Sequence, residues 1–302
     1  MKSAMKKRFG GLFGSRPTAS DTPLREVFRR FRRNKVAVAG LIVFLLICFA
    51  CIFAPFITRW EYFEVNVPRR LEGPSADYIL GTDALGRDIF SRLLYGGRIT
   101  LRIALVSTVA AAVIGGIMGL AAGYFGRRAD SFISPVLDAI ASIPVILLAV
   151  VIESVFGWAR GYFMYAIIIA AIPQFARLVR ASVMNIIGSE YIEAAKALGV
   201  SHFGIIYRHV LHNVAPQFIV RFTGGLAESL LTCTIMGYLD IGITPPMPEW
   251  GVMVYLSRSY VFSTPLSMII PCAVISICVI SIGLFGDGLR DALDPKEITM
   301  QE

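Results

Sequence analysis

Six long apolar segments dominate the sequence and constrain its fold more than any other feature. A helix crosses the hydrocarbon core of a bilayer with about 20 mostly apolar residues. The segments of about this length are Val36–Ile57 and residues 101–125, 132–156, 162–179, 214–239 and 265–286. With 56% hydrophobic and only 17% charged residues, the chain is too apolar for a soluble domain. The sequence therefore predicts an all-α integral membrane protein with six transmembrane helices.

The basic residues indicate how these helices are oriented. Residues 1–35 contain eleven Lys and Arg against two acidic residues, whereas residues 59–98 contain six of each kind. Because segments rich in Lys and Arg stay in the cytoplasm, we expect a cytoplasmic amino terminus. An even number of spans then returns the carboxyl terminus to the same side. Attraction to anionic lipid headgroups explains a basic cluster beside the first span, so no nucleic-acid partner is expected.

This orientation divides the chain into parts. We expect a basic cytoplasmic tail (1–35), a first transmembrane helix (36–58), an extracytoplasmic loop (59–98), a core with the second to sixth transmembrane helices (99–289) and a cytoplasmic tail (290–302). Within the extracytoplasmic loop, Asp88–Arg98 alternates apolar and basic residues, as expected of an amphipathic helix lying in the outer interface. In the second span, Gly119 and Gly123 form a G-x-x-x-G pattern that predicts close helix packing.

A polar, alanine-rich segment within residues 189–213 separates the fourth and fifth spans on the predicted cytoplasmic side. Residues 190–198 contain no helix breaker. Tyr191, Ala194, Ala195 and Leu198 fall at positions i, i+3, i+4 and i+7, so they form one apolar face of a helix. Gly199 follows where a left-handed residue would end the helix. Nine residues rise only about 13 Å, so this helix does not cross the membrane. It is either an amphipathic connector in the interface or a surface that fits a partner's groove.

Four ordered motifs together resemble one protein family. Glu193-Ala194-Ala195, with Gly199 six positions after the glutamate, resembles the EAA loop of ABC importer permeases. The other motifs are GTDALGRDIFSR at 81–92, PPMPEWG at 245–251 and GDGLRDALDP at 286–295. They resemble the C-type permease subunit of dipeptide, oligopeptide and nickel importers, and the resemblance extends from about residue 24 to residue 296.

The resemblance implies a type I ABC importer permease in a bacterial plasma membrane, which is the inner membrane in a Gram-negative organism. The implied partners are a second homologous permease subunit, two cytoplasmic ABC ATPase subunits or domains, and an extracytoplasmic solute-binding protein. This chain has no Gly-Lys dipeptide and so no P-loop. ATP and magnesium are therefore expected in the ATPases, and no cofactor is expected here. The implied solute is a dipeptide or oligopeptide, with nickel, glutathione or another small solute as the alternative.

The resemblance also assigns the coupling to the ATPases to Tyr191, Glu193, Ala194, Ala195, Leu198 and Gly199. We expect the alanines to let the helix seat closely, Gly199 to set the turn and Glu193 to supply a charged hydrogen bond. The sequence departs from the family pattern at one place. His212 follows Leu211 where the family has a proline, and the proline is delayed to Pro216, which predicts a different entry into the fifth span.

Charged residues inside spans are costly and are therefore candidates for function. Asp138 lies between two prolines and can satisfy backbone amides that proline leaves free. With Pro144 it also matches a D-x-x-x-x-x-P pattern of similar permeases, which implies helix packing around the pathway. Arg221 and Glu228 are seven residues apart on one helical face, so each either pairs with another helix or lines a wet pathway.

A proline-rich turn precedes the sixth span. Pro245, Pro246 and Pro248 make this turn stiff, and Trp250 is expected at the level of the lipid headgroups. The resemblance implies that Pro246, Glu249 and Trp250 lie on the outer face, near the surface on which the binding protein docks.

The sequence contains no H-E-x-x-H zinc motif and no G-x-S-x-G nucleophile motif. Cys48 and Cys51 have C-x-x-C spacing, but they lie in an apolar helix without further ligands, so we expect core residues rather than a metal or redox site. A transport subunit, not an enzyme, is therefore expected. The alternatives are a self-contained channel or secondary transporter, with Asp138, Glu153 and Glu228 as an ion path, and, ranked last, a structural or receptor-like membrane protein.

Overall fold

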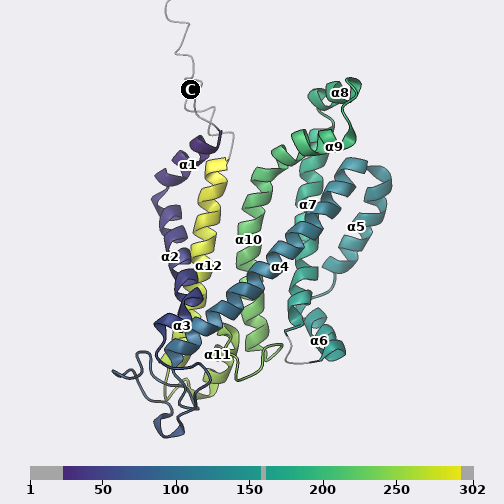
Figure 1. Ribbon diagram of the computed structural model, residues 1–302. Helices are drawn as coiled ribbons and strands as arrows, with labels where there is room; N and C mark the ends of the chain where they lie inside the picture. Colours follow the sequence, from purple (N-terminus) through teal and green to yellow (C-terminus); the bar gives the residue numbers. More distant parts are fainter. Residues whose placement is uncertain (1–22, 158–160, 294–302) are drawn as a thin grey trace, which may run out of the picture.

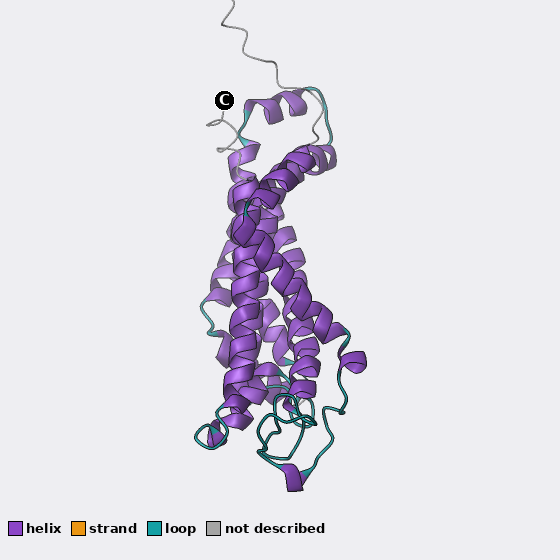
Figure 2. Cartoon of the chain, turned by 90° about the vertical axis from the view of Figure 1, so that its left-hand side faces the viewer, coloured by secondary structure: helices purple, strands orange, loops and turns teal. Residues whose placement is uncertain are grey.

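The computed structural model describes residues 23–157 and 161–293, and these residues form helices joined by loops (Figure 2). Five helices are long and apolar enough to cross a membrane. They are α2 (Lys35–Ile52), α4 (Ile89–Phe125), α7 (Phe163–Ile187), α10 (Leu211–Tyr238) with the turns that lead into it, and α12 (Leu266–Leu293). The predicted all-helical membrane fold is confirmed.

The third predicted span is not one straight helix. Residues 132–156 were expected to form a single helix, but the structure has α5 (Arg127–Ala141) and α6 (Val145–Phe156), which meet at 87°. The break lies at Ser142-Ile143-Pro144, where proline disfavours helical geometry in the preceding residue and lacks an N–H. Pro144 therefore ends one helix and starts the next, and the pair counts as a sixth span only if the bend is included.

The interfacial helix predicted at Asp88–Arg98 is wrong as a separate element. Asp88 instead caps α4, because its carboxylate accepts a hydrogen bond of 2.8 Å from the backbone N–H of Ser91, and the helix continues without interruption to Phe125. Ile89 and Leu93 are buried in the core. The boundary expected at residue 98 thus lies inside α4. This helix of 37 residues is about 55 Å long and crosses the molecule obliquely (Figure 1).

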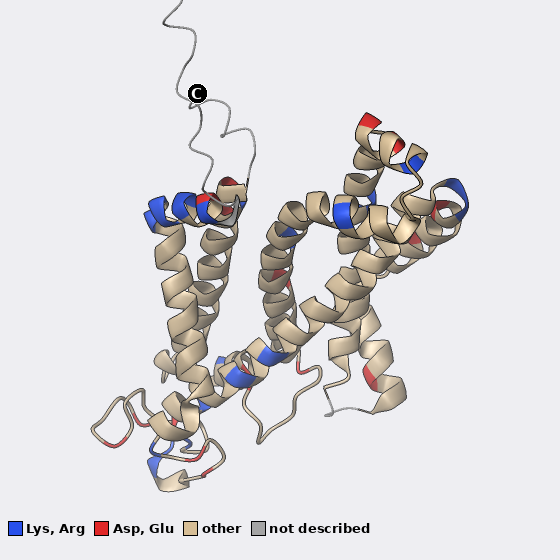
Figure 3. Ribbon diagram, turned by 45° about the horizontal axis from the view of Figure 1, so that its top comes forward, with Lys and Arg blue, Asp and Glu red and all other residues tan. Residues whose placement is uncertain are grey.

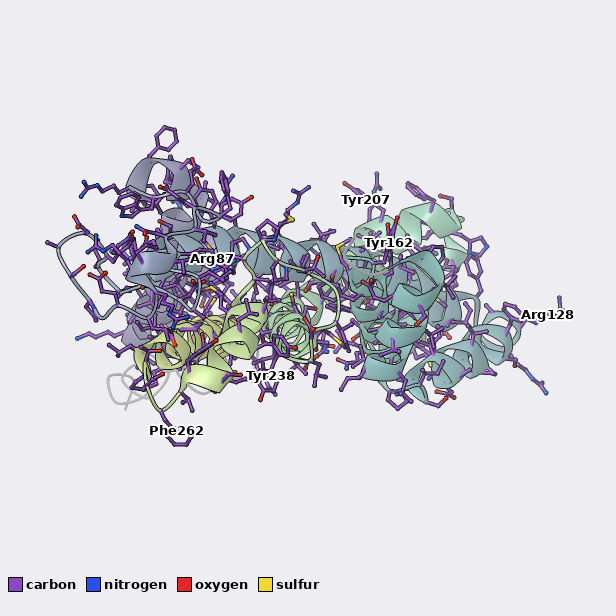
Figure 4. The ribbon with its side chains drawn as sticks, turned by 90° about the horizontal axis from the view of Figure 1, so that it is seen from below. Arg87, Arg128, Tyr162, Tyr207, Tyr238 and Phe262 are labelled. Atoms are coloured by element: carbon purple, nitrogen blue, oxygen red, sulfur yellow. The ribbon has the colours of Figure 1, made fainter. Side chains whose placement is uncertain are left out.

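The helices form two groups that α4 and α10 connect (Figures 1 and 4). In one group α12 packs against α2, and in the other α7 packs against α4, α5 and α6, while α10 contacts α12, α4 and α7. The contact between α4 and α7 depends on glycine: a Cβ atom on Gly119 would lie 2.3 Å from the carbonyl oxygen of Ala176, and one on Gly115 would lie 2.6 Å from that of Ile172. The close packing predicted from the glycine pattern is confirmed.

The short elements complete the fold at its two ends. They are α1 (Pro23–Arg33), α3 (Ala54–Ile57), η1 (Val67–Arg69), α8 (Glu190–Ala197), α9 (His202–Ile205), η2 (Ile206–Val210), α11 (Trp250–Ser257) and η3 (Arg258–Tyr260). Figure 1 shows α1, α8 and the end of α12 at one end of the bundle, opposite α3 and α11. Lys and Arg residues gather on α1 (Figure 3), as expected of the cytoplasmic end.

Candidate functional site

The helix α8 stands out at the cytoplasmic end because only one side of it packs against its own chain. Ile192 is fully buried and belongs to a cluster with Val183 of α7, Ile205 of α9 and Val214 of α10. Ala195 is also buried, with 8% of its surface exposed. These residues fix α8 to the bundle, so Ala195 contributes to internal packing and does not lie on the outer face expected for it.

The opposite side of α8 is open. Tyr191, Glu193 and Ala194 are exposed, and Leu198 at the end of the helix exposes 84% of its surface. A large aliphatic side chain so exposed at the end of a helix gives up the free energy of burial unless another molecule covers it. The predicted apolar face is therefore split: Ala195 faces inward, whereas Tyr191, Ala194 and Leu198 form an outward face, hereafter the α8 surface.

Gly199 ends α8 in the predicted left-handed conformation, with a φ of +78°. The N–H of Val200 donates to the carbonyl of Ala195 at 3.1 Å, and that of Gly199 donates to the carbonyl of Lys196 at 2.9 Å. These two bonds form a Schellman motif. The Ser201 side chain then accepts from the N–H of Gly204 at 3.2 Å and caps α9, so the chain turns back sharply after α8.

Two side-chain contacts tie this turn to the spans. The hydroxyl of Tyr124, at the end of α4, lies 2.8 Å from Nδ1 of His202, and Nδ2 of Asn213 donates to the Tyr191 hydroxyl at 3.3 Å. Just before the Leu211-His212 step, the chain forms a π-helical turn, η2, and α10 then passes through Pro216 without a break.

The charged residues predicted for the pathway form ion pairs. Asp138 of α5 accepts from Arg177 of α7 at 2.8 Å, and both side chains are more than half exposed. Arg221 and Glu228 were expected to pair with other helices or to line a wet path, but they pair with each other across two turns of α10, at 3.1 and 2.7 Å. Fifty-four per cent of the Glu228 side chain is exposed, and a carboxylate so exposed is costly next to lipid.

An open groove of about 590 Å³ lies beside this pair. Its polar lining comes from Asn213, Gln217 and Arg221 of α10 and from Arg290 near the end of α12, and Leu178 of α7 lies across from them. Glu153, which the alternative ion path would use, is fully buried instead, and its Oε1 accepts from the N–H of Phe163 at 2.8 Å. Glu153 therefore holds the start of α7 in place.

Trp250 does not face the lipid headgroups as an interfacial residue would. Trp250 is completely buried, and its indole N–H donates to the carbonyl of Leu93 at 2.8 Å. Its ring lies so close to α4 that a Cβ atom on Gly97 would approach it to 2.7 Å. Trp250 starts α11, which packs against α4, α10 and α12, so this residue belongs to the core and not to an outer docking surface.

Glu249 is likewise part of the interior and not of an exposed loop. Its Oε1 accepts from the Thr100 hydroxyl of α4 at 2.9 Å, and its Oε2 accepts from the N–H of Val252 at 3.0 Å, which caps α11. Burial raises the pKa of the Glu249 carboxyl, although the hydrogen bonds that it accepts act in the opposite direction. Thr100 gave no signal in the sequence because a threonine inside an apolar helix is common.

A second cluster of buried polar side chains lies at the same outer end. Asp83 accepts from the side chain of Arg87 at 2.7 Å and lies 3.5 Å from that of Arg92, and both arginines are almost completely buried. Arg92 also donates to the carbonyls of Tyr62 and Pro246. Pro246 thus contributes a backbone contact to this group. Figure 4 shows this end from below, with Arg87 amid the group of helices that includes α2 and α12. The GTDALGRDIFSR motif therefore ties the extracytoplasmic segment to α4.

The fold and these motifs agree with the comparisons to known proteins. Residues 111–299 match the binding-protein-dependent transport system inner membrane component, and residues 22–74 match the N-terminal TM domain of oligopeptide transport permease C. The chain belongs to this family of inner-membrane permeases of ABC transport systems, whose members are transport subunits and not enzymes. Membership in a binding-protein-dependent transport system implies ATPase and binding-protein partners.

Individual relatives share most of the chain. A dipeptide transport system permease protein DppC of Alkalihalophilus pseudofirmus is 41% identical over 91% of this chain and 90% of its own. A glutathione transport system permease protein GsiD of Pectobacterium atrosepticum is 40% identical over 91% of this chain and 92% of its own. Among solved structures, an inward-facing MetNI methionine ABC transporter chain aligns with a TM-score of 0.56 and 22% identity, over 67% of this chain and 96% of its own, which supports the fold.

Proposed function

We propose that this chain is the C-type permease subunit of an importer for dipeptides or other short peptides, and that the α8 surface is where a cytoplasmic ATPase docks. The observation that carries the proposal is the exposure of Leu198, with Tyr191 and Ala194 beside it, on a helix whose other side is fixed to the bundle. A small apolar face of this kind fits the helix-in-groove mode of recognition.

The arrangement suits the transmission of force from an ATPase. The buried residues Ile192 and Ala195 join α8 to α7, α9 and α10, so a displacement of α8 would be passed on to these helices. ATP and magnesium would bind in the ATPases. A second homologous permease would complete the pathway, and alternating access would result from rocking one half against the other.

The relatives support a peptide as the solute. One is named for dipeptides and another for glutathione, and both solutes are peptidic molecules with free carboxylates. The exposed Arg221–Glu228 pair and the polar groove beside it would give a charged solute a wet surface along α10. A self-contained transporter that uses Glu153 as an ion site is disfavoured, since Glu153 is engaged with the start of α7.

Purification of the tagged chain from its native membrane, followed by mass spectrometry, tests the proposal. We expect a second permease and one or two P-loop ATPases to accompany it. Leu198→Asp should remove the ATPases from the purified complex, because a buried, unpaired carboxylate is costly, while the thermal stability of the chain itself stays the same. Val65→Asp, at an exposed apolar residue of the extracytoplasmic segment, is the matched control and should retain the ATPases.

Two results would count against the proposal. Full recovery of the ATPases with Leu198→Asp would show that the α8 surface is not their docking site. A stable complex without any ATPase in the wild type would contradict the importer assignment itself and would direct attention to Asp138 and Glu228 as parts of an ion path.

A further inference from the structure

A second groove lies at the outer end of α4, away from the α8 surface. It has a volume of about 530 Å³, which is in the range of small-molecule sites. Four segments far apart in the sequence line it, represented by Tyr62, by Tyr95 to Val106 of α4, by Gly161 with Met164, and by Ile243 with Met247 and Pro248. Because several segments converge here, the groove is a built concavity and not the bare side of one helix.

Among the residues that the structure describes, the groove contains two arginines that lack a carboxylate partner, unlike most other arginines of the outer end. Arg98 and Arg102 lie one helical turn apart on α4, both are exposed and both line the groove, which contains no carboxylate in its lining. Within the part of the chain that the structure describes, neither forms an ion pair, whereas Arg69, Arg87 and Arg92 of the same end all lie within 4 Å of a carboxylate. Figure 3 shows the basic residues on the outer half of α4, a helix without any acidic residue.

Aromatic rings hold one of these arginines in a defined place. The guanidinium of Arg98 lies 5.9 Å from the ring centre of Tyr95, and that ring packs at 5.0 Å against Tyr62. An arginine that rests on an aromatic ring keeps its donors free for another ligand. A guanidinium group is planar and can donate two parallel hydrogen bonds to a carboxylate. Two such groups, one helical turn apart, therefore suit a carboxylate ligand.

We propose that Arg98 and Arg102 form a receiving site for the carboxylate of the transported peptide at the outer mouth of the pathway. This inference rests on the proposed importer function and names the part of the solute that this chain recognises. Tyr62 and Tyr95 would lie against the peptide's side chains, and the positive groove would attract the solute as the binding protein releases it. A lipid phosphate is the competing ligand, but the walls that Gly161 with Met164 and Ile243 with Met247 and Pro248 add to the groove favour a small solute.

The test uses the complete importer in vesicles of phosphatidylcholine alone, with its binding protein and radiolabelled dialanine outside. Arg98→Gln with Arg102→Gln should lower the initial rate of uptake about tenfold or more, because two charge-assisted contacts are lost. The Lys/Lys double variant keeps the charges but loses the planar, bidentate donors, so its uptake should fall between that of the Gln/Gln variant and that of the wild type. Arg70→Gln removes another exposed arginine of the outer segment, outside the groove, and should have no effect.

Further measurements distinguish a peptide site from a docking contact and from a lipid contact. The Gln/Gln variant should purify with its partners, and the loaded binding protein should still stimulate its ATPase activity. Loss of that stimulation would assign the arginines to docking of the binding protein and overturn the inference. A defect that appears only when phosphatidylglycerol is added would assign them to lipid, and equal uptake by the Gln/Gln variant and the wild type would also overturn it. Absence of dialanine uptake by the wild type would instead contradict the proposed function on which the inference rests.

Discussion

The two ends of the molecule use their polar and apolar residues in opposite ways. At the outer end, Glu249, Thr100 and Asp83 are engaged with partners in their own chain, and even the large Trp250 is buried. At the cytoplasmic end, α8 buries Ile192 and Ala195 but leaves Leu198 open. These residues of the outer end are therefore stabilised by their own chain, whereas the cytoplasmic end leaves open the apolar surface that we propose for ATPase docking.

Because the outer end depends on internal contacts, we expect the largest loss of stability when Glu249 is replaced. Glu249→Ala leaves the buried Val252 N–H without its acceptor and leaves the Thr100 hydroxyl with the Gly96 carbonyl alone. We expect a loss of about 3 kcal/mol in the free energy of unfolding. Thermal unfolding in detergent measures it. Glu249→Gln keeps one acceptor oxygen and should lose less. Glu64→Ala, at an exposed residue of the extracytoplasmic segment, is the control, and equal unfolding temperatures of Glu249→Ala and this control would contradict the internal role.

At the cytoplasmic end we expect a smaller and local effect. Ile192→Ala removes the main apolar anchor of α8, which costs about 2 kcal/mol. Because this helix packs only at the edge of the bundle, the loss should appear as faster hydrogen exchange of the α8 amides and not as global unfolding. Leu198→Ala on the exposed side should leave exchange unchanged. A fall in global stability as large as that of Glu249→Ala would remove the contrast between the two ends.

The smallest expected effect concerns pH. Burial raises the pKa of Glu249 in the folded protein, whereas the unfolded chain keeps the ordinary value of about 4.3. The folded state thus holds its proton more tightly. Stability from this group is full below the ordinary value and declines as the pH rises through the raised one, by at most about 1.4 kcal/mol per pH unit. Unfolding measured across this window should show the decline in the wild type and not in Glu249→Gln, and the same slope in both would refute the assignment.

The sequence predicted what depends on local composition. Hydropathy identified five spans, the glycine pattern predicted the contact of α4 with α7, and Gly199 predicted the turn after α8. The proline at Pro144 indicated a weak point, but the angle between α5 and α6 depends on how both helices pack. These features succeed because each follows from a few neighbouring residues.

The errors concern contacts between residues far apart in the chain. Trp250 was expected at the headgroups because tryptophan is common there, but its hydrogen-bond partner Leu93 is 157 residues away. The extracytoplasmic loop was extended to residue 98 because the alternation of apolar and basic residues at 88–98 suggested an interfacial helix, whereas Gly97 lies inside α4 and provides room for the Trp250 ring. For the candidate site, sequence identified the α8 residues but not the inward position of Ala195, which depends on the packing of α8 against α7 and α10.

The length of α4 has a mechanical consequence. A continuous helix of 37 residues is about 55 Å long, and it reaches from the buried group around Asp83 to Tyr124, which contacts the turn after α8. A stiff rod that pivots near its middle moves its ends in opposite directions, so a tilt of about 10° would carry each end roughly 5 Å. If α4 tilts as a rigid body, a displacement of its cytoplasmic end would move its outer end in the opposite direction. The two ends would then be coupled through the helix itself and not through a chain of side-chain contacts.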